Sequence, residues 1–199
     1  MTKRIKIAKR HNDLPTPRFP TAMTEVNSQT PRGAAIAGAA YLDLLLRSAI
    51  EKLMRDDHDI QTTLFENRGG LQGFSTRIQL GYALKIYEWQ AYQDLSTIRD
   101  IRNAFAHSAE KIDFDREDVA LLCNRLWFPE HVDYWDKPKP TDPRSKFIRG
   151  VELMADGLLE EILQHSLVQH FLQMGPKKPM PVASPKEKRM RRSQNRPAN

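Results

Sequence analysis

Cysteine is nearly absent from this chain of 199 residues. The single cysteine, Cys123, excludes an intrachain disulfide and a zinc site built from cysteines. We find no apolar run that we expect to span a bilayer. The N-terminus is basic but no apolar core follows it, so it does not have the pattern of a secretory signal. These absences favour a reducing, cytoplasmic location.

Proline is missing from residues 32–128, which permits long helices there because every residue keeps its backbone donor. The prolines gather instead before residue 32, between residues 129 and 143, and after residue 174. We therefore predict a flexible, basic and proline-rich arm (1–31), a helical domain (32–174) and a disordered basic tail (175–199).

The positive charge of the chain lies at its two ends. Residues 1–32 hold seven basic and two acidic residues, and residues 175–199 hold eight basic and one acidic residue. Residues 33–174 hold 16 basic and 22 acidic residues, so the folded part is mildly acidic. We expect the tail either to solubilise the protein or to bind nucleic acid weakly and without sequence preference. The tail residues expected to make such contacts are Lys186, Lys188, Arg189, Arg191 and Arg192.

Apolar residues recur at helical spacing along the middle of the chain. The pattern predicts helices over residues 32–54, 76–87 and 89–107, with Ser75 as the N-cap of the second and a loop over 56–73. A fourth helix is expected after Asp115, and Asp142 followed by Pro143 is expected to open a fifth. No convincing alternating strand is present. The sequence therefore predicts an all-α, antiparallel bundle of about five helices.

Unusual polar residues interrupt the apolar pattern near the end of the third predicted helix. Arg102, Asn103 and His107 lie there, and Arg99 shares a helix face with Asn103 and His107. Arginine and histidine together can perform phosphate chemistry. The same residues can instead only orient the helix, with Arg102 paired to a carboxylate of a neighbouring helix such as Asp43.

The geometry of an ideal helix separates Arg102 and His107 by about 140°. They converge only if the helix ends or bends near Ala106, or if a second subunit supplies one of them. The small residues over 33–40 would let another helix approach closely, either from the same bundle or from a second copy of the chain. We expect a homodimer.

Three blocks of this sequence, residues 69–84, 92–95 and 98–107, resemble the mannitol operon repressor family. The resemblance extends over about residues 32–163 and implies an all-α bacterial transcriptional regulator. We find no helix-turn-helix. We therefore expect a non-enzymatic regulator that acts mainly through protein–protein contacts, with Arg77 and Arg99 as candidate binding residues and no cofactor.

The segment from Arg102 to His107 is also similar, more loosely, to the Arg-polar-x-x-x-His motif of HEPN-type helical domains. That resemblance implies the alternative function, a metal-independent ribonuclease that works as a dimer. Arg102 would hold the scissile phosphate, His107 would act as general base or acid on the ribose 2′-hydroxyl, and Asn103 would orient either group. No metal is needed, because RNA supplies its own nucleophile.

Two further groups of residues are candidates of lower rank. Glu161 and His165 share a helix face, but no third ligand has helical spacing, so a solvated face is the better interpretation. The aromatic residues around Pro129 would either stack on bases or pack a long loop onto the bundle. These aromatic residues are Trp127, Phe128, Tyr134 and Trp135.

Overall fold

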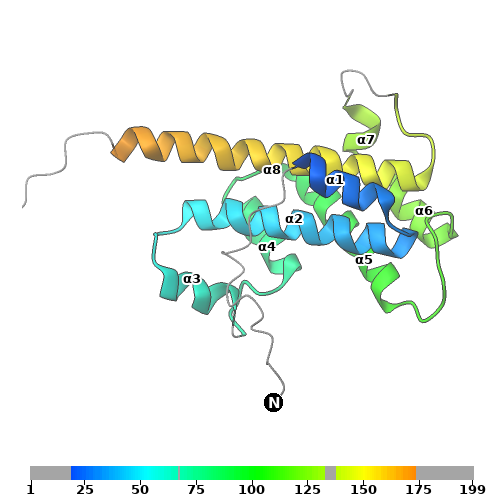
Figure 1. The fold of residues 1–199 in the computed structure, drawn as a ribbon, viewed down its shortest axis with the longest axis horizontal. Coiled ribbons are helices and arrows are strands. Elements are labelled where there is room, and N and C mark those ends of the chain that lie inside the picture. The colour runs from blue at the N-terminus through cyan, green and yellow to red at the C-terminus, as the bar shows by residue number, and fades with distance from the viewer. Residues whose placement is uncertain (1–18, 67, 133–137, 174–199) are drawn as a thin grey trace, which may run out of the picture. The chain divides into compact units, whose positions relative to one another are not determined.

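The computed structural model describes residues 19–66, 68–132 and 138–173, and within these ranges the chain forms eight helices and no strand (Figure 1). The helices are α1 (Phe19–Ser28), α2 (Pro31–Leu53), α3 (His58–Phe65), α4 (Phe74–Ala83), α5 (Trp89–His107), α6 (Glu117–Asn124), α7 (Phe128–His131) and α8 (Pro143–Gln173). The prediction of an all-α fold is confirmed, with α1, α3 and α7 added to the five expected helices.

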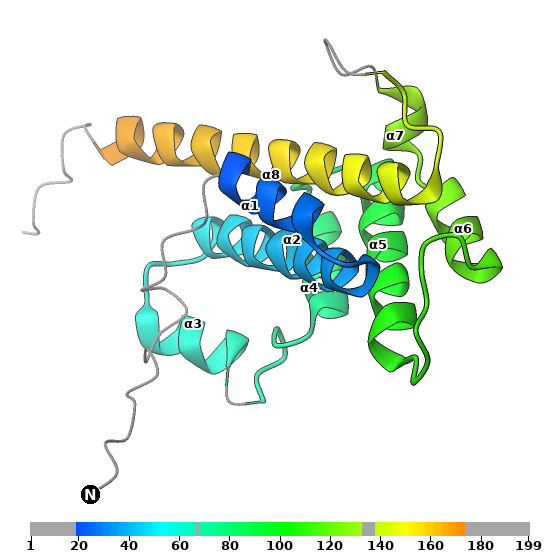
Figure 2. The same ribbon diagram turned by 45° about the vertical axis from the view of Figure 1, so that its right-hand side comes forward.

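Helix α2 is the centre of the bundle. It packs against α1, α4 and α5, and α1 lies beside it in both views (Figures 1 and 2). Leu42, Leu45, Leu46 and Ile50 are fully buried on it. By length and composition α2 is apolar enough to cross a membrane, contrary to the expectation from sequence. More than half of its apolar window (56%) is buried inside the protein, as in a core helix.

The small residues at the start of α2 make room for another helix of the same chain. A Cβ added at Gly38 would lie 3.1 Å from Val151 Cγ2 and 3.3 Å from Phe147 Cε1, both on α8. Ala34 and Ala35 are fully buried beside it. The sequence left open whether this face packs within the bundle or against a second copy of the chain. In the structure it packs against α8 of the same chain.

The expected arm over 1–31 is too long. Helix α1 lies inside it, because Ala22, Met23 and Val26 form an apolar stripe that is buried against the bundle. Helix α2 also begins one residue earlier than expected. Thr30 caps it by accepting a hydrogen bond from the Gly33 N–H (3.2 Å), and Pro31 occupies the first helical position. Residues 1–18 lie outside the described residues.

Helix α4 is shorter than the helix predicted over 76–87. It ends in a Schellman motif, in which the Ile86 N–H bonds to the Gly81 carbonyl (3.0 Å) and the Lys85 N–H bonds to the Tyr82 carbonyl (3.0 Å). Lys85 adopts the left-handed conformation that this motif requires (φ 60°). The N-cap of α4 is Gly73, without a side-chain bond, so the expectation that Ser75 caps it is wrong.

Two helix starts differ from the expected ones. Helix α3 lies in the predicted loop over 56–73, and Asp57 caps it by accepting a hydrogen bond from the Ile60 N–H (3.1 Å). The N-cap of α6 is Arg116 and not Asp115. Asp113 accepts hydrogen bonds from the backbone N–H groups of both residues (3.1 and 3.2 Å), which forms a turn before the helix.

Helix α8 begins as predicted. Asp142 accepts a hydrogen bond from the Ser145 N–H (2.9 Å), and Pro143 is the first helical residue. The compact unit that contains the bundle ends at Ser166, and a second unit begins at Leu167, of which the end of α8 is described. The predicted disordered tail over 175–199 lies outside the described residues.

Candidate functional site

Helix α5 carries the polar segment that the sequence singles out. Its inward side is apolar, because Leu95, Ile98, Ile101 and Phe105 are each at most 1% exposed. Its outward side is polar for the same periodic reason. The helix continues without a break to His107 and ends there, so Arg102 and His107 both keep helical spacing and no bend near residue 106 brings them together.

The side chains of the segment are accessible. Arg102 and His107 are exposed, and Asn103 is half-buried. The guanidinium of Arg102 donates to Asn103 Oδ1 (2.8 Å), which links the two residues that the motif pairs. Arg99 is half-buried and donates to Asp100 Oδ1 (2.7 Å). The segment therefore presents two exposed basic side chains, Arg102 and His107, to an incoming partner or phosphate, beside the ion-paired Arg99.

The backbone after α5 is held by α2. Arg32 donates from Nη2 to the Ser108 carbonyl (3.0 Å) and to the Glu110 carbonyl (2.7 Å). These carbonyls follow the C-terminus of α5, where unpaired acceptors accumulate. The contact fixes the position of the end of α5, and with it the position of His107.

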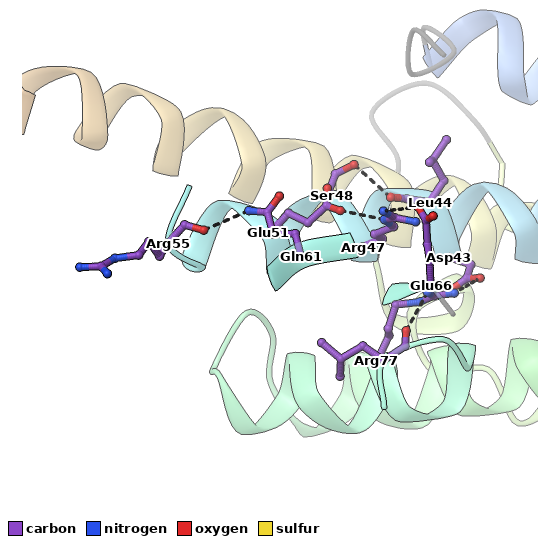
Figure 3. Close-up of polar contacts among 10 residues, drawn as sticks. Asp43, Leu44, Arg47, Ser48, Glu51, Arg55, Gln61, Glu66 and Arg77 are labelled. Carbon is purple, nitrogen blue, oxygen red and sulfur yellow. Dashed lines mark hydrogen bonds and ion pairs between the residues drawn. The ribbon is translucent and has the colours of Figure 1, made fainter. Parts of the chain in front are cut away.

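Arg77, the other candidate binding residue, lies inside the protein (Figure 3). Its Nε donates to Asp43 Oδ1 (2.7 Å), its Nη2 donates to Asp43 Oδ2, and its Nη1 donates to the Leu71 carbonyl (2.9 Å). Arg77 is 7% exposed. Asp43 therefore pairs with Arg77, and the expected pair between Asp43 and Arg102 is wrong. The contact ties α4 and the preceding loop to α2.

A second ion-pair group lies along α2 beside the first (Figure 3). Arg47 donates to Glu51 (2.8 Å) and to Glu66 (3.4 Å), and its guanidinium lies 4.8 Å from the centre of the Phe65 ring. Glu66 and Phe65 stand at the end of α3. Arg47 and Arg77 are thus both buried and held by carboxylates of the protein, so Arg77 is not available to a partner on the surface.

Asp94 is a structural carboxylate that we did not foresee from the sequence. It is 1% exposed and accepts hydrogen bonds from the backbone N–H groups of Trp127 (2.9 Å) and Phe128 (3.0 Å) at the start of α7. Burial raises the pKa of Asp94, and these two hydrogen bonds oppose the rise. The sequence feature that could have revealed Asp94 is its place on the inward side of α5, next to Leu95 and one turn before Ile98, where an acidic residue is unusual.

The ring contacts of the described residues form three groups. Phe114 contacts Phe105 (ring centroids 4.8 Å apart) and Phe147 (5.2 Å) inside the core. At α7, Trp127 stacks on His131 (4.4 Å) and its edge meets Phe128, which packs against the core. Tyr82, Trp89 and Tyr92 form the third group, with centroids 5.2–5.9 Å apart, at the junction of α4 and α5. Tyr134 and Trp135 lie outside the described residues.

The third group contains the most exposed aromatic side chain of the described residues. Trp89 is 51% exposed, against 40% for Trp127 and 39% for Tyr82. We call Tyr82, Trp89 and Tyr92 the aromatic cluster. Tyr82 belongs to α4, and Trp89 and Tyr92 lie at the start of α5, the helix that carries Arg99, Arg102 and His107 nearer its other end.

Metal binding finds no support among the described residues, where no group of three or more histidine, cysteine, aspartate or glutamate side chains is placed to hold an ion. His165 and Glu161 lie on α8 without such a third ligand. The basic residues of the predicted nucleic-acid tail, 186–192, lie outside the described residues.

Comparison with known proteins shows a similarity of fold, but no similarity to a family model or to a curated sequence. No protein-family model matches the chain, and no curated protein matches its sequence. Among solved structures, a chain of the MtlR–HPr complex from Escherichia coli superposes with a TM-score of 0.52 at 18% sequence identity. The match covers 74% of this chain and 98% of the other. This chain therefore has an MtlR-like, all-α fold.

Proposed function

We propose that this chain is a mannitol-repressor-like transcriptional regulator that acts through contacts with another protein. The fold carries the proposal, because the similar chain was crystallised in a complex with HPr. The sequence blocks over 69–84, 92–95 and 98–107 support it independently. Recognition through a helix-turn-helix is not part of the proposal.

The aromatic cluster is the part of the described surface best suited to a protein partner. Tyrosine and tryptophan are enriched at protein interfaces, where a few such residues carry most of the binding energy. Trp89 is half exposed and is stacked on Tyr92 (24° between the rings), so its position is already set before binding. We place the partner on this cluster and on the adjoining outward side of α5, including Arg99.

Calorimetric titration with purified HPr tests the proposal. We expect binding, and we expect Trp89→Ala to weaken it by at least about tenfold, since interface tryptophans are frequent hot spots. Leu121→Ala is the matched control, because Leu121 is 59% exposed on α6, away from the cluster. Absence of binding by the wild-type chain would contradict the proposal for this partner. Repression is tested by comparing transcript levels in cells with and without the chain.

A second candidate function is the metal-independent ribonuclease. The observation that favours it is the exposure of both Arg102 and His107, with Asn103 bonded to Arg102. In this proposal His107 takes the proton of the ribose 2′-hydroxyl, and the 2′-oxygen attacks phosphorus to form a 2′,3′-cyclic phosphate. The bond from phosphorus to the 5′-oxygen breaks, this oxygen leaves with a proton taken from water, and Arg102 holds the phosphate. Because both residues are on one unbroken helix, a second copy of the chain must complete the site.

Incubation with RNA distinguishes this candidate from the regulator. We expect His107→Ala to lower cleavage by about 100-fold or more if His107 is the general base. His131→Ala is the control, because His131 is also exposed but lies on α7. Equal cleavage by the wild-type chain and by His107→Ala would remove the catalytic role. Light scattering measures the homodimer on which this mechanism depends.

A further inference from the structure

A pocket of about 570 Å³ opens between the α4–α5 connection, α7 and α8. Its walls are mainly apolar, with Ile86, Leu95, Phe128, Leu153, Met154 and Leu158 among them. This volume falls within the range of about 300–1,000 Å³ that is usual for small-molecule sites. Leu95 and Asp94 are neighbours on α5, so the Asp94 contacts that hold α7 also hold this wall in place.

Gly157 leaves one side of the pocket open. It lies within α8, where glycine disfavours the helix relative to alanine. A Cβ added at Gly157 would meet no atom within 4 Å, in contrast to Gly38, whose missing side chain makes room for another helix. Gly157 is exposed and is one of the residues that line the pocket, so the open space beside it lies at the solvent-facing mouth of the pocket.

Glu88 supplies the charge of the pocket. It is the one charged side chain in the lining, and Gln90 lies beside it near the start of α5. Glu88 precedes α5 as its N-cap but makes no capping hydrogen bond with its side chain. Within the described part of the chain, no cation pairs with Glu88. Glu88 is exposed at the edge of the pocket, so it offers a cation the modest attraction of a solvent-screened ion pair.

We propose that this pocket binds a small ligand with an apolar body and one cationic group. The body occupies the space between Met154, Phe128 and the open flank of Gly157, and the cation lies at Glu88. The chemical class is an alkyl or aryl-alkyl amine. The proposal does not depend on the partner protein proposed above, since its site and its ligand are separate from the aromatic cluster.

Three probes with the same body test the class of ligand. 4-Phenylbutylamine, 4-phenylbutan-1-ol and 4-phenylbutyrate differ only in the head group, and NMR titration of the full chain measures their affinities. We expect the amine to bind about fivefold more tightly than the alcohol at low salt, as for a partly exposed ion pair, and the acid to bind most weakly. Equal affinity for all three, as expected of an apolar patch for a protein, or binding of none overturns the proposal.

Two substitutions locate the site. Gly157→Phe should place a bulky ring at the mouth of the pocket and lower the affinity for the amine by at least about tenfold, while Gly157→Ala, which adds only a Cβ, should retain it. Glu88→Gln should remove the preference for the amine over the alcohol. Melting curves verify that each variant is folded, which the open space at Gly157 and the exposure of Glu88 lead us to expect. Unchanged binding to Gly157→Phe places the ligand elsewhere and overturns the assignment.

Discussion

At the scale of single residues, two arginines that the sequence offers as candidate site residues have opposite environments. Arg77 is enclosed by Asp43 and Leu71, whereas Arg102 is exposed. The environment of Arg77 cannot be derived from helical periodicity, because its partner lies 34 residues away. Periodicity assigns a side chain to a face of its own helix, but the helix that covers that face is decided by the tertiary arrangement.

The first prediction concerns the Asp43–Arg77 pair. Asp43→Ala leaves a buried guanidinium without its carboxylate, so we expect the free energy of unfolding to fall by about 3 kcal/mol. Urea denaturation measures the change. Asp100→Ala is the control, because it breaks the more exposed pair with Arg99 and should cost less than about 1 kcal/mol. If Asp43→Ala and Asp100→Ala lower the free energy of unfolding by similar amounts, burial does not determine how much the Asp43–Arg77 pair stabilises the protein.

The second prediction concerns the titration of Asp94. Because burial raises its pKa in the folded state above the ordinary value of 3.8, the folded protein binds the proton more readily than the unfolded chain. The contribution of Asp94 to stability is therefore greatest below pH 3.8 and falls as the pH rises through the raised pKa. Urea denaturation from pH 4 to pH 7 should show wild type losing stability relative to Asp94→Asn. A constant difference between the two proteins would contradict the raised pKa.

At the scale of elements, the helices with clear apolar periodicity were predictable whatever their length. Helices α2, α5 and α8 follow from extended periodicity, Asp142 with Pro143 marks the start of α8, and the shorter α4 and α6 were expected as well. Helices α1 and α3 have the same lengths as α4 and α6, 10 and 8 residues, but α1 begins beside Pro20 in a proline-rich segment and α3 lies in a polar one, so both segments were interpreted as loops. Their stability comes from burial of Met23, Val26 and Phe65 against the bundle.

The third prediction concerns the cap of α8. Asp142→Ala removes the acceptor of the Ser145 N–H and should cost about 1 kcal/mol at neutral pH. The hydrogen bonds from Ser145 lower the pKa of Asp142, so this contribution is present above pH 3.8 and is lost as the pH falls through the lowered value. Thermal unfolding at pH 7 and pH 3 measures both effects.

Asp115→Ala is the matched control for the cap. Asp115 precedes α6 but is not its N-cap, so its removal should change the stability by less than about 0.5 kcal/mol. If Asp115→Ala and Asp142→Ala lose the same amount of stability, the effect of Asp142→Ala is not due to the loss of the helix cap.

At the scale of the whole molecule, the charge distribution separates the ends of the chain from the bundle. The fourth prediction is that deletion of residues 175–199 removes a segment with eight basic residues and lowers the affinity for nucleic acid. The dependence of that affinity on salt should weaken as well. Filter binding at several salt concentrations measures both. Unchanged binding by the shortened chain would place the contact on the bundle.

The sequence by itself determined the helical class, the proline-free span of the main helices, the cap of α8 and the polarity of the outward side of α5. These properties depend on local backbone chemistry and on periodicity, which neighbouring residues set. The tertiary structure decided that Asp43 pairs with Arg77, that Asp94 holds α7, and that Gly157 and Glu88 border one pocket. Those relations join residues on different helices, and only the packing of the bundle determines which helices meet.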